Sequence, residues 1–241
     1  MNRVGRSSAR RWAGIGMTTV IVCLGFTREA WTEPAHQLFR SPEAAFAYLH
    51  AVATHQRCVN CHGTDRAGQR IPTVGDTMAL HPMNITERHN PRNQCPTPEE
   101  RDRPAPIVAI KCTSCHGVEN SREPGGPPGA WDTHLEWQMP TRDITRLQRE
   151  MSKQALCRNW HAAIQERVKQ AEQCPGKKLS ASELFTAHIA EDGLIAWAFD
   201  PGPGRTPAPG SLERLKAAAR IWAPMLESDT WCHTLEKDRR P

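Results

Sequence analysis

The chain has 241 residues, 38% of them hydrophobic, with a mean hydropathy of -0.61 and a formal net charge of +5. This length suffices for one medium domain or two small lobes and excludes a large multidomain enzyme. Five of the 31 basic residues and one of the 26 acidic residues lie in the first 30 positions, which leaves 26 basic against 25 acidic residues in the rest. That near-neutral balance points neither to a nucleic acid nor to an anionic membrane surface as a partner.

Residues 1–30 have the organisation of a secretory signal peptide. A basic segment with four arginines precedes an apolar run over residues 12–26, which has the length of a signal-peptide core. A permanent transmembrane helix needs about 17 to 25 apolar residues, so we expect cleavage rather than anchoring, at a site that the sequence leaves open. The mature protein would then be residues 31–241, in the periplasm.

The first helix of the mature protein is expected directly after Ser41. This serine can cap the helix, and Pro42 occupies the first helical position, where proline is favoured. An apolar stripe follows at Phe46, Leu49, Val52 and Ala53. The pattern predicts a short helix that leads the chain into residues 58–62.

Two copies of one short motif follow. Residues 58–62 read Cys-Val-Asn-Cys-His and residues 112–116 read Cys-Thr-Ser-Cys-His, and C-x-x-C-H is the attachment pattern of c-type haem. Two thiols separated by two residues reach the two vinyl groups on one edge of the macrocycle, and the adjacent histidine turns back to the iron. The expected attachment residues are Cys58, Cys61, Cys112 and Cys115, and the expected proximal iron ligands are His62 and His116.

Two other interpretations of these motifs exist, namely C-x-x-C disulfides or one zinc site built from the four motif cysteines. The presence of two copies in one short chain, behind an export signal, argues against a chance occurrence of the motif. Zinc would also leave the histidine after each motif unexplained. We therefore favour two covalent haem c groups, each with one iron, as the cofactors.

The spacing of the motifs predicts the fold class. Only 49 residues separate His62 from Cys112, which is short for a complete single-haem lobe with its own distal ligand. We expect a mainly α, cytochrome c-like domain over residues 31–241, in which short helices and long loops wrap around both haems, with two very small lobes as the alternative. The single Tyr and five Phe leave few aromatic core residues, so the haems are expected to fill much of the interior.

The distal iron ligands are the weakest part of the sequence pattern, because any His or Met could serve. His81 or Met83, in a loop after the first motif, could reach the first haem. The remaining candidates are Met78, His89, His134, Met139, Met151, His161 and His188.

Four cysteines remain once the leader and the haem motifs are set aside: Cys95, Cys157, Cys174 and Cys232. An even number of cysteines in an oxidising compartment predicts disulfide bonds. Three pairings are possible, and we favour Cys157 with Cys232 and Cys95 with Cys174.

Further helices are expected in the second half of the chain. One begins near Ser152 and extends towards Val168, and another begins at Ser180 or Ser182 and reaches His188. A Pro- and Gly-rich loop occupies residues 200–205, and an amphipathic helix runs from Ser211 to Trp222. Five tryptophans either shield haem faces or pack in the core: Trp131, Trp137, Trp160, Trp197 and Trp222.

Residues 188–210 read His-Ile-Ala-Glu-Asp-Gly-Leu-Ile-Ala-Trp-Ala-Phe-Asp-Pro-Gly-Pro-Gly-Arg-Thr-Pro-Ala-Pro-Gly. This stretch resembles a bacterial family of exported haem proteins labelled isoquinoline 1-oxidoreductase subunits. The likeness spans most of residues 55–235 and also takes in the second motif, residues 127–130, Cys157 and the terminal helix near Trp222 and Cys232. The chain departs from the family pattern in a longer, more charged segment after Cys157 and in the additional Cys174.

The resemblance implies site residues and a partner. The family pattern has histidines that match His81 and His188 and one in the region of His134, which implies His81 and His188 as distal ligands. The family's association with molybdenum hydroxylases implies such an oxidoreductase as the redox partner protein. This chain has no molybdopterin or iron–sulfur motif, so its part would be electron transfer and not hydroxylation.

Three classes of function remain. We favour a periplasmic dihaem c-type cytochrome with six-coordinate, low-spin haems that transfers electrons, as a carrier or as the electron-accepting subunit of a periplasmic oxidoreductase. A dihaem peroxidase with one open iron would make the chain an enzyme by itself, but such enzymes resemble two cytochrome lobes with more distant motifs. A haem-based sensor would need a signalling partner that the chain does not contain.

Overall fold

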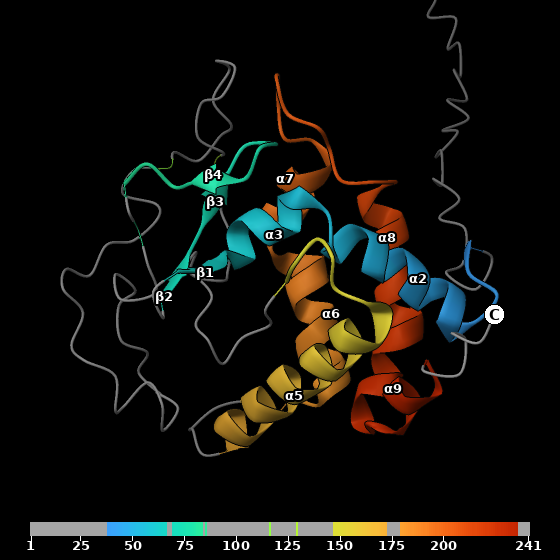
Figure 1. The fold of residues 1–241 in the computed structure, drawn as a ribbon. Helices are drawn as coiled ribbons and strands as arrows, with labels where there is room; N and C mark the ends of the chain where they lie inside the picture. The colour runs from blue at the N-terminus through green and yellow to red at the C-terminus, as the bar shows by residue number, and fades with distance from the viewer. Residues whose placement is uncertain are drawn as a thin grey trace, which may run out of the picture. The chain divides into compact units, whose positions relative to one another are not determined.

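The structure is a computed structural model that describes residues 38–66, 69–83, 85, 116, 129, 147–172 and 179–235. Several predicted features lie outside these residues: the signal peptide at residues 1–30, the cysteines Cys95, Cys112, Cys115 and Cys174, and the tryptophans Trp131 and Trp137. The part of the chain that is described is mainly helical (Figure 1). The coarse fold class expected from the sequence is therefore confirmed.

The first predicted helix is α2, Pro42–Ala53, which packs against α8, Leu212–Trp222 (Figure 1). The Ser41 side chain accepts a hydrogen bond from the backbone N–H of Ala44 at 3.2 Å. Ser211 caps α8 in the same way, through the backbone N–H of Arg214. Both helices begin where a serine satisfies a backbone donor that the helix leaves free, as predicted.

Two helices of the second half are also confirmed, with sharper bounds. α5 is Lys153–Glu172, beginning after Ser152 and extending beyond Val168. α6 is Ala181–Glu191, and its cap is Ser180, which forms a reciprocal capping box with Glu183. A short further helix, α7, Gly193–Phe199, follows α6 after the single residue Asp192, which ends one helix and caps the next.

Several short elements were not predicted. The first C-x-x-C-H motif lies on a helix of its own, α3, Gln56–His62. Two antiparallel hairpins follow it, and η3 and α9 follow α8. Their bounds are Thr64–Arg66 for β1, Gln69–Ile71 for β2, Thr73–Val74 for β3, Ala79–Leu80 for β4, Ala223–Glu227 for η3 and Thr230–Thr234 for α9. Strands of two or three residues are too short for their alternation to be visible in a sequence.

Aromatic rings from five helices meet in the helical core. The Phe46 ring centre lies 4.8 Å from that of Trp222 and 5.0 Å from that of Trp231, and Trp160 lies 5.0 Å from Phe185. The chain has few Phe and Tyr but eight Trp. Tryptophan therefore supplies much of the aromatic surface that is buried in this core. Trp160 and Trp222 are therefore residues of the hydrophobic core.

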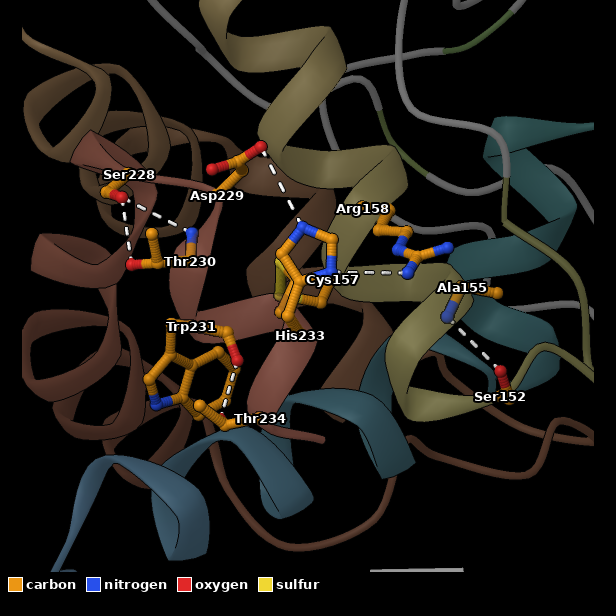
Figure 2. The surroundings of a disulfide bond; sticks show 11 residues. Ser152, Ala155, Cys157, Arg158, Ser228, Asp229, Thr230, Trp231, His233 and Thr234 are labelled. Carbon is orange, nitrogen blue, oxygen red and sulfur yellow. Dashed lines mark hydrogen bonds and ion pairs between the residues drawn. A yellow bond between two sulfur atoms is a disulfide. The ribbon is translucent and has the colours of Figure 1, made fainter. Parts of the chain in front are cut away.

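The disulfide predicted between Cys157 and Cys232 is present and joins α5 to α9 (Figure 2). Both residues are buried, and their Cα atoms are 5.6 Å apart. Figure 2 shows the contacts of the His233 ring with Arg158 and Asp229. The covalent bond fixes the carboxy-terminal helix on the aromatic core.

The loop between α7 and α8 is fixed at its far end by Tyr48 of α2. The Tyr48 hydroxyl donates to the carbonyl of Pro209 at 2.9 Å and accepts from the backbone N–H of Ser211 at 3.0 Å. Gly210 has a φ of +83°, and a Cβ atom there would overlap the Tyr48 hydroxyl. Glycine is needed at this position for both reasons.

None of the helices that the structure describes is both long and apolar enough to cross a lipid bilayer.

Phe46→Ala is expected to lower the free energy of unfolding by about 3–5 kcal/mol, because it removes a fully buried ring from the centre of the aromatic core. Urea unfolding followed by circular dichroism measures this loss. The matched variant Phe46→Leu keeps most of the volume and should cost clearly less. Equal stability of the alanine variant and the parent would show that this ring does not support the core.

Candidate haem site

The first motif is presented by one short helix. On α3, Cys58 and Cys61 are three residues apart, which places them on one face of the helix. Gly63 ends the helix directly after His62 with a φ of +71°, a conformation that glycine adopts without strain. Both thiols and the histidine are thus presented together at the end of α3.

The Cys58 thiol is not part of a disulfide, so the structure does not support a C-x-x-C disulfide at the first motif. Burial raises the pKa of Cys58 to about 12, which keeps the thiol neutral at neutral pH. Of the four cysteines in the zinc interpretation, Cys112 and Cys115 lie outside the described residues.

The imidazole of His62 faces the imidazole of His188, which lies on α6. The two ring centres are 6.3 Å apart and their planes cross at 77°. His188 is brought to this place by the last turn of α6, directly before Asp192 ends the helix. The sequence predicted both residues as iron ligands, and the fold sets them opposite each other.

A second histidine pair is formed by His81 and His116. Their ring centres are also 6.3 Å apart, with planes at 41°. His81 directly follows β4, and its backbone N–H donates to the carbonyl of Pro72 at 3.0 Å. Burial, and secondly the charge of His116, lowers the pKa of His81, which favours the neutral imidazole that binds metals.

The ring-centre distance that both histidine pairs share is the one expected for two imidazoles bound to one iron. With a metal–nitrogen distance of about 2.0 Å and about 1.1 Å more to each ring centre, two imidazoles on opposite sides of one iron have centres a little over 6 Å apart. Both pairs match this spacing. Within the described ranges, no group of three or more His, Cys, Asp or Glu is arranged to hold a metal ion.

The sequence left open which motif His81 would approach. Its ring lies next to that of His116 from the second motif, and the ring of His188 lies next to that of His62 from the first. The hairpin of β3 and β4 directs the chain after Leu80 towards the second motif, a turn that the sequence pattern did not reveal. The two sites are therefore interleaved along the chain.

The other candidate distal ligands lie at the surface, in the core or outside the described residues. Met83 is 65% exposed, whereas Met78 and Met151 pack against the helical core. His161 is half-buried on α5. His89, His134 and Met139 lie outside the described residues.

An ion pair between a buried arginine and an exposed aspartate lies next to the first motif. Arg57, 1% exposed, pairs with Asp76 of the turn between β3 and β4, and its Nε donates to the carbonyl of Thr206 at 2.7 Å. Asp76 in turn accepts hydrogen bonds from the backbone N–H and the hydroxyl of Thr206, at 3.1 and 2.6 Å. This network ties α3, the hairpin and the loop after α7 together, and the sequence analysis did not find it.

A second polar contact joins the motif itself to the hairpin. Asn60, inside the motif, accepts a hydrogen bond from the Thr73 hydroxyl at 2.8 Å and donates to the Gly75 carbonyl at 2.9 Å. Asn60 and Thr73 are both buried, 4% and 5% exposed. Since Thr73 pairs with Leu80, the residue before His81, the contact fixes one histidine pair relative to the other.

Two buried donors near the first motif have no hydrogen-bond partner. They are Nη1 of Arg57 and Nε1 of Trp197 on α7, and the Arg57 guanidinium lies 5.7 Å from the centre of the Trp197 ring. Unsatisfied buried donors are costly and uncommon. An acceptor supplied by a bound group would satisfy them.

Protein-family models, curated proteins and solved structures all give no match to this chain.

Asp76→Asn is expected to lower the free energy of unfolding by about 1–3 kcal/mol, because it leaves the buried Arg57 guanidinium without its counter-charge. Thermal or urea unfolding measures the change. Asp229→Asn, at an exposed aspartate near the disulfide, is the matched control and should change stability by less than about 0.5 kcal/mol. If the two variants were equally stable, the ion pair would have no structural importance.

Proposed function

We propose that this chain is a periplasmic dihaem c-type cytochrome that transfers electrons. The observation that carries the proposal is the presence of two opposed histidine pairs, each including the histidine of one C-x-x-C-H motif and each with ring centres 6.3 Å apart. The motifs were recognised without reference to these distances, and the distances suit one iron between the two rings of each pair.

The surrounding residues fit such a group. Cys58 and Cys61 share one face of α3, where both can form thioethers to the same macrocycle edge. Arg57 Nη1 and Trp197 Nε1 are buried donors without partners, and the carboxylates that a haem carries are suitable acceptors for them. When bound, each haem supplies a one-electron iron couple.

The histidine pairs also favour electron transfer over peroxidase chemistry. A peroxidase needs one iron with an open position for the oxidant, whereas both motif histidines here face a second imidazole. Two axial protein ligands leave no position for a substrate at either iron. The protein's task in this proposal is to hold both irons six-coordinate, to exclude water and to set their potentials.

Location and partner follow from the sequence. The predicted signal peptide at residues 1–30 supports a periplasmic location, the compartment in which a disulfide such as Cys157–Cys232 persists. The family resemblance supports a redox partner protein of the molybdenum hydroxylase type. In that assembly the chain would accept electrons from the catalytic subunit and pass them on.

The haem content of the mature chain, measured by the pyridine haemochrome assay, tests the proposal. We expect two covalent haems in the parent protein and one in the double variant Cys58→Ser/Cys61→Ser, because each motif attaches its own haem. Ser114→Ala, which changes the second motif without removing a thiol, is the matched control and should retain both haems.

A mature parent chain without covalent haem would refute the proposal. An oxidised spectrum with one high-spin iron that binds cyanide and turns over hydrogen peroxide would replace it by the dihaem peroxidase alternative.

A further inference from the structure

A carboxylate lies behind one of the four histidines. Asp192, between α6 and α7, places Oδ2 3.3 Å from Nδ1 of His188, four residues earlier. Its Oδ1 accepts the backbone N–H of Leu194 at 2.9 Å, which caps α7. The Asp192 side chain is only 15% exposed, so the contact is shielded from solvent on the carboxylate side.

Both oxygens of the Asp192 carboxylate face a nitrogen, Oδ1 the backbone N–H of Leu194 and Oδ2 the Nδ1 of His188. An aspartate is ordinarily an anion at neutral pH. An anion at this place holds a proton on Nδ1 of His188 and leaves Nε2 free to bind a metal.

At His81, by contrast, Nδ1 is a hydrogen-bond acceptor. Its Nδ1 accepts a hydrogen bond from the backbone N–H of Met83 at 3.3 Å. Binding of a metal through Nε2 requires the proton on Nδ1, so this bond is lost when Nε2 becomes a ligand. His188 is held in the metal-binding tautomer in advance, and His81 is not.

We propose that Asp192 is a positioning residue that orients His188 as an axial ligand and lowers the reduction potential of the haem held by His62 and His188. The inference rests on the proposed function. A hydrogen bond to an anion makes the imidazole a stronger electron donor, and a negative charge near the iron favours the ferric form. Both effects act in the same direction.

Asp192→Asn tests this, because asparagine is an equally good helix cap and can still accept the Leu194 N–H, so the fold is preserved while the charge is removed. In a spectroelectrochemical titration of the dihaem protein, one of the two midpoint potentials should rise by about 59 mV or more. That shift is a tenfold change in the ratio of oxidised to reduced haem. The other potential should change much less.

Two further variants make the result specific. Glu191→Gln removes an exposed carboxylate one residue away and should leave both potentials nearly unchanged. Asp192→Glu retains the charge and should keep the affected potential close to that of the parent.

The outcomes separate the two proposals. Two attached haems with potentials that do not respond to Asp192→Asn, or that respond equally to Glu191→Gln, would overturn the role of Asp192 and leave the proposed function intact. A parent chain without covalent haem would overturn both.

Discussion

The separation of two imidazole rings is the constraint on which the rest of this account depends. An iron bound on both sides by histidine requires ring centres a little over 6 Å apart, and each ring must come from a part of the chain that the fold brings into place. His62 ends α3, His188 occupies the last turn of α6, and His81 follows β4. The ring centres of both pairs are 6.3 Å apart, and contacts among the elements that carry His62, His188 and His81 fix the positions of these three residues.

Two kinds of interaction fix these elements relative to one another. The aromatic core around Phe46 and Trp222, together with the disulfide, fixes the helices. Polar contacts fix the site: the buried Arg57 joins α3 to Asp76 and Thr206, and Asn60 joins the motif to the hairpin. Hydrogen bonds of Asn60 with Thr73 and Gly75 join the hairpin to the motif, and the position of His81 follows from the pairing of β3 with β4.

Sequence patterns predicted what depends on local chemistry. Ser41 and Ser211 mark helix starts, and spacing alone marks the C-x-x-C-H motifs. The opposition of His188 to His62 and the contact between Arg57 and Asp76 depend on long-range packing, which one sequence does not encode as a local pattern. A lone aspartate such as Asp192 also gives no signal until the end of α6 is known. The two hairpins were not predicted, because strands of two or three residues show no alternating pattern. The position of His81 near His116 depends on the pairing of β3 with β4, which is likewise invisible in the sequence.

In the proposed function each iron would lie between two histidines, an arrangement that low-temperature electron paramagnetic resonance of the oxidised mature protein can test. We predict low-spin ferric signals typical of two imidazole ligands for both haems, with no high-spin signal. His188→Ala should convert one of the two haems, and only one, to a high-spin form. A parent protein with a high-spin iron, or a His188→Ala variant in which both haems stay low-spin, would contradict the account.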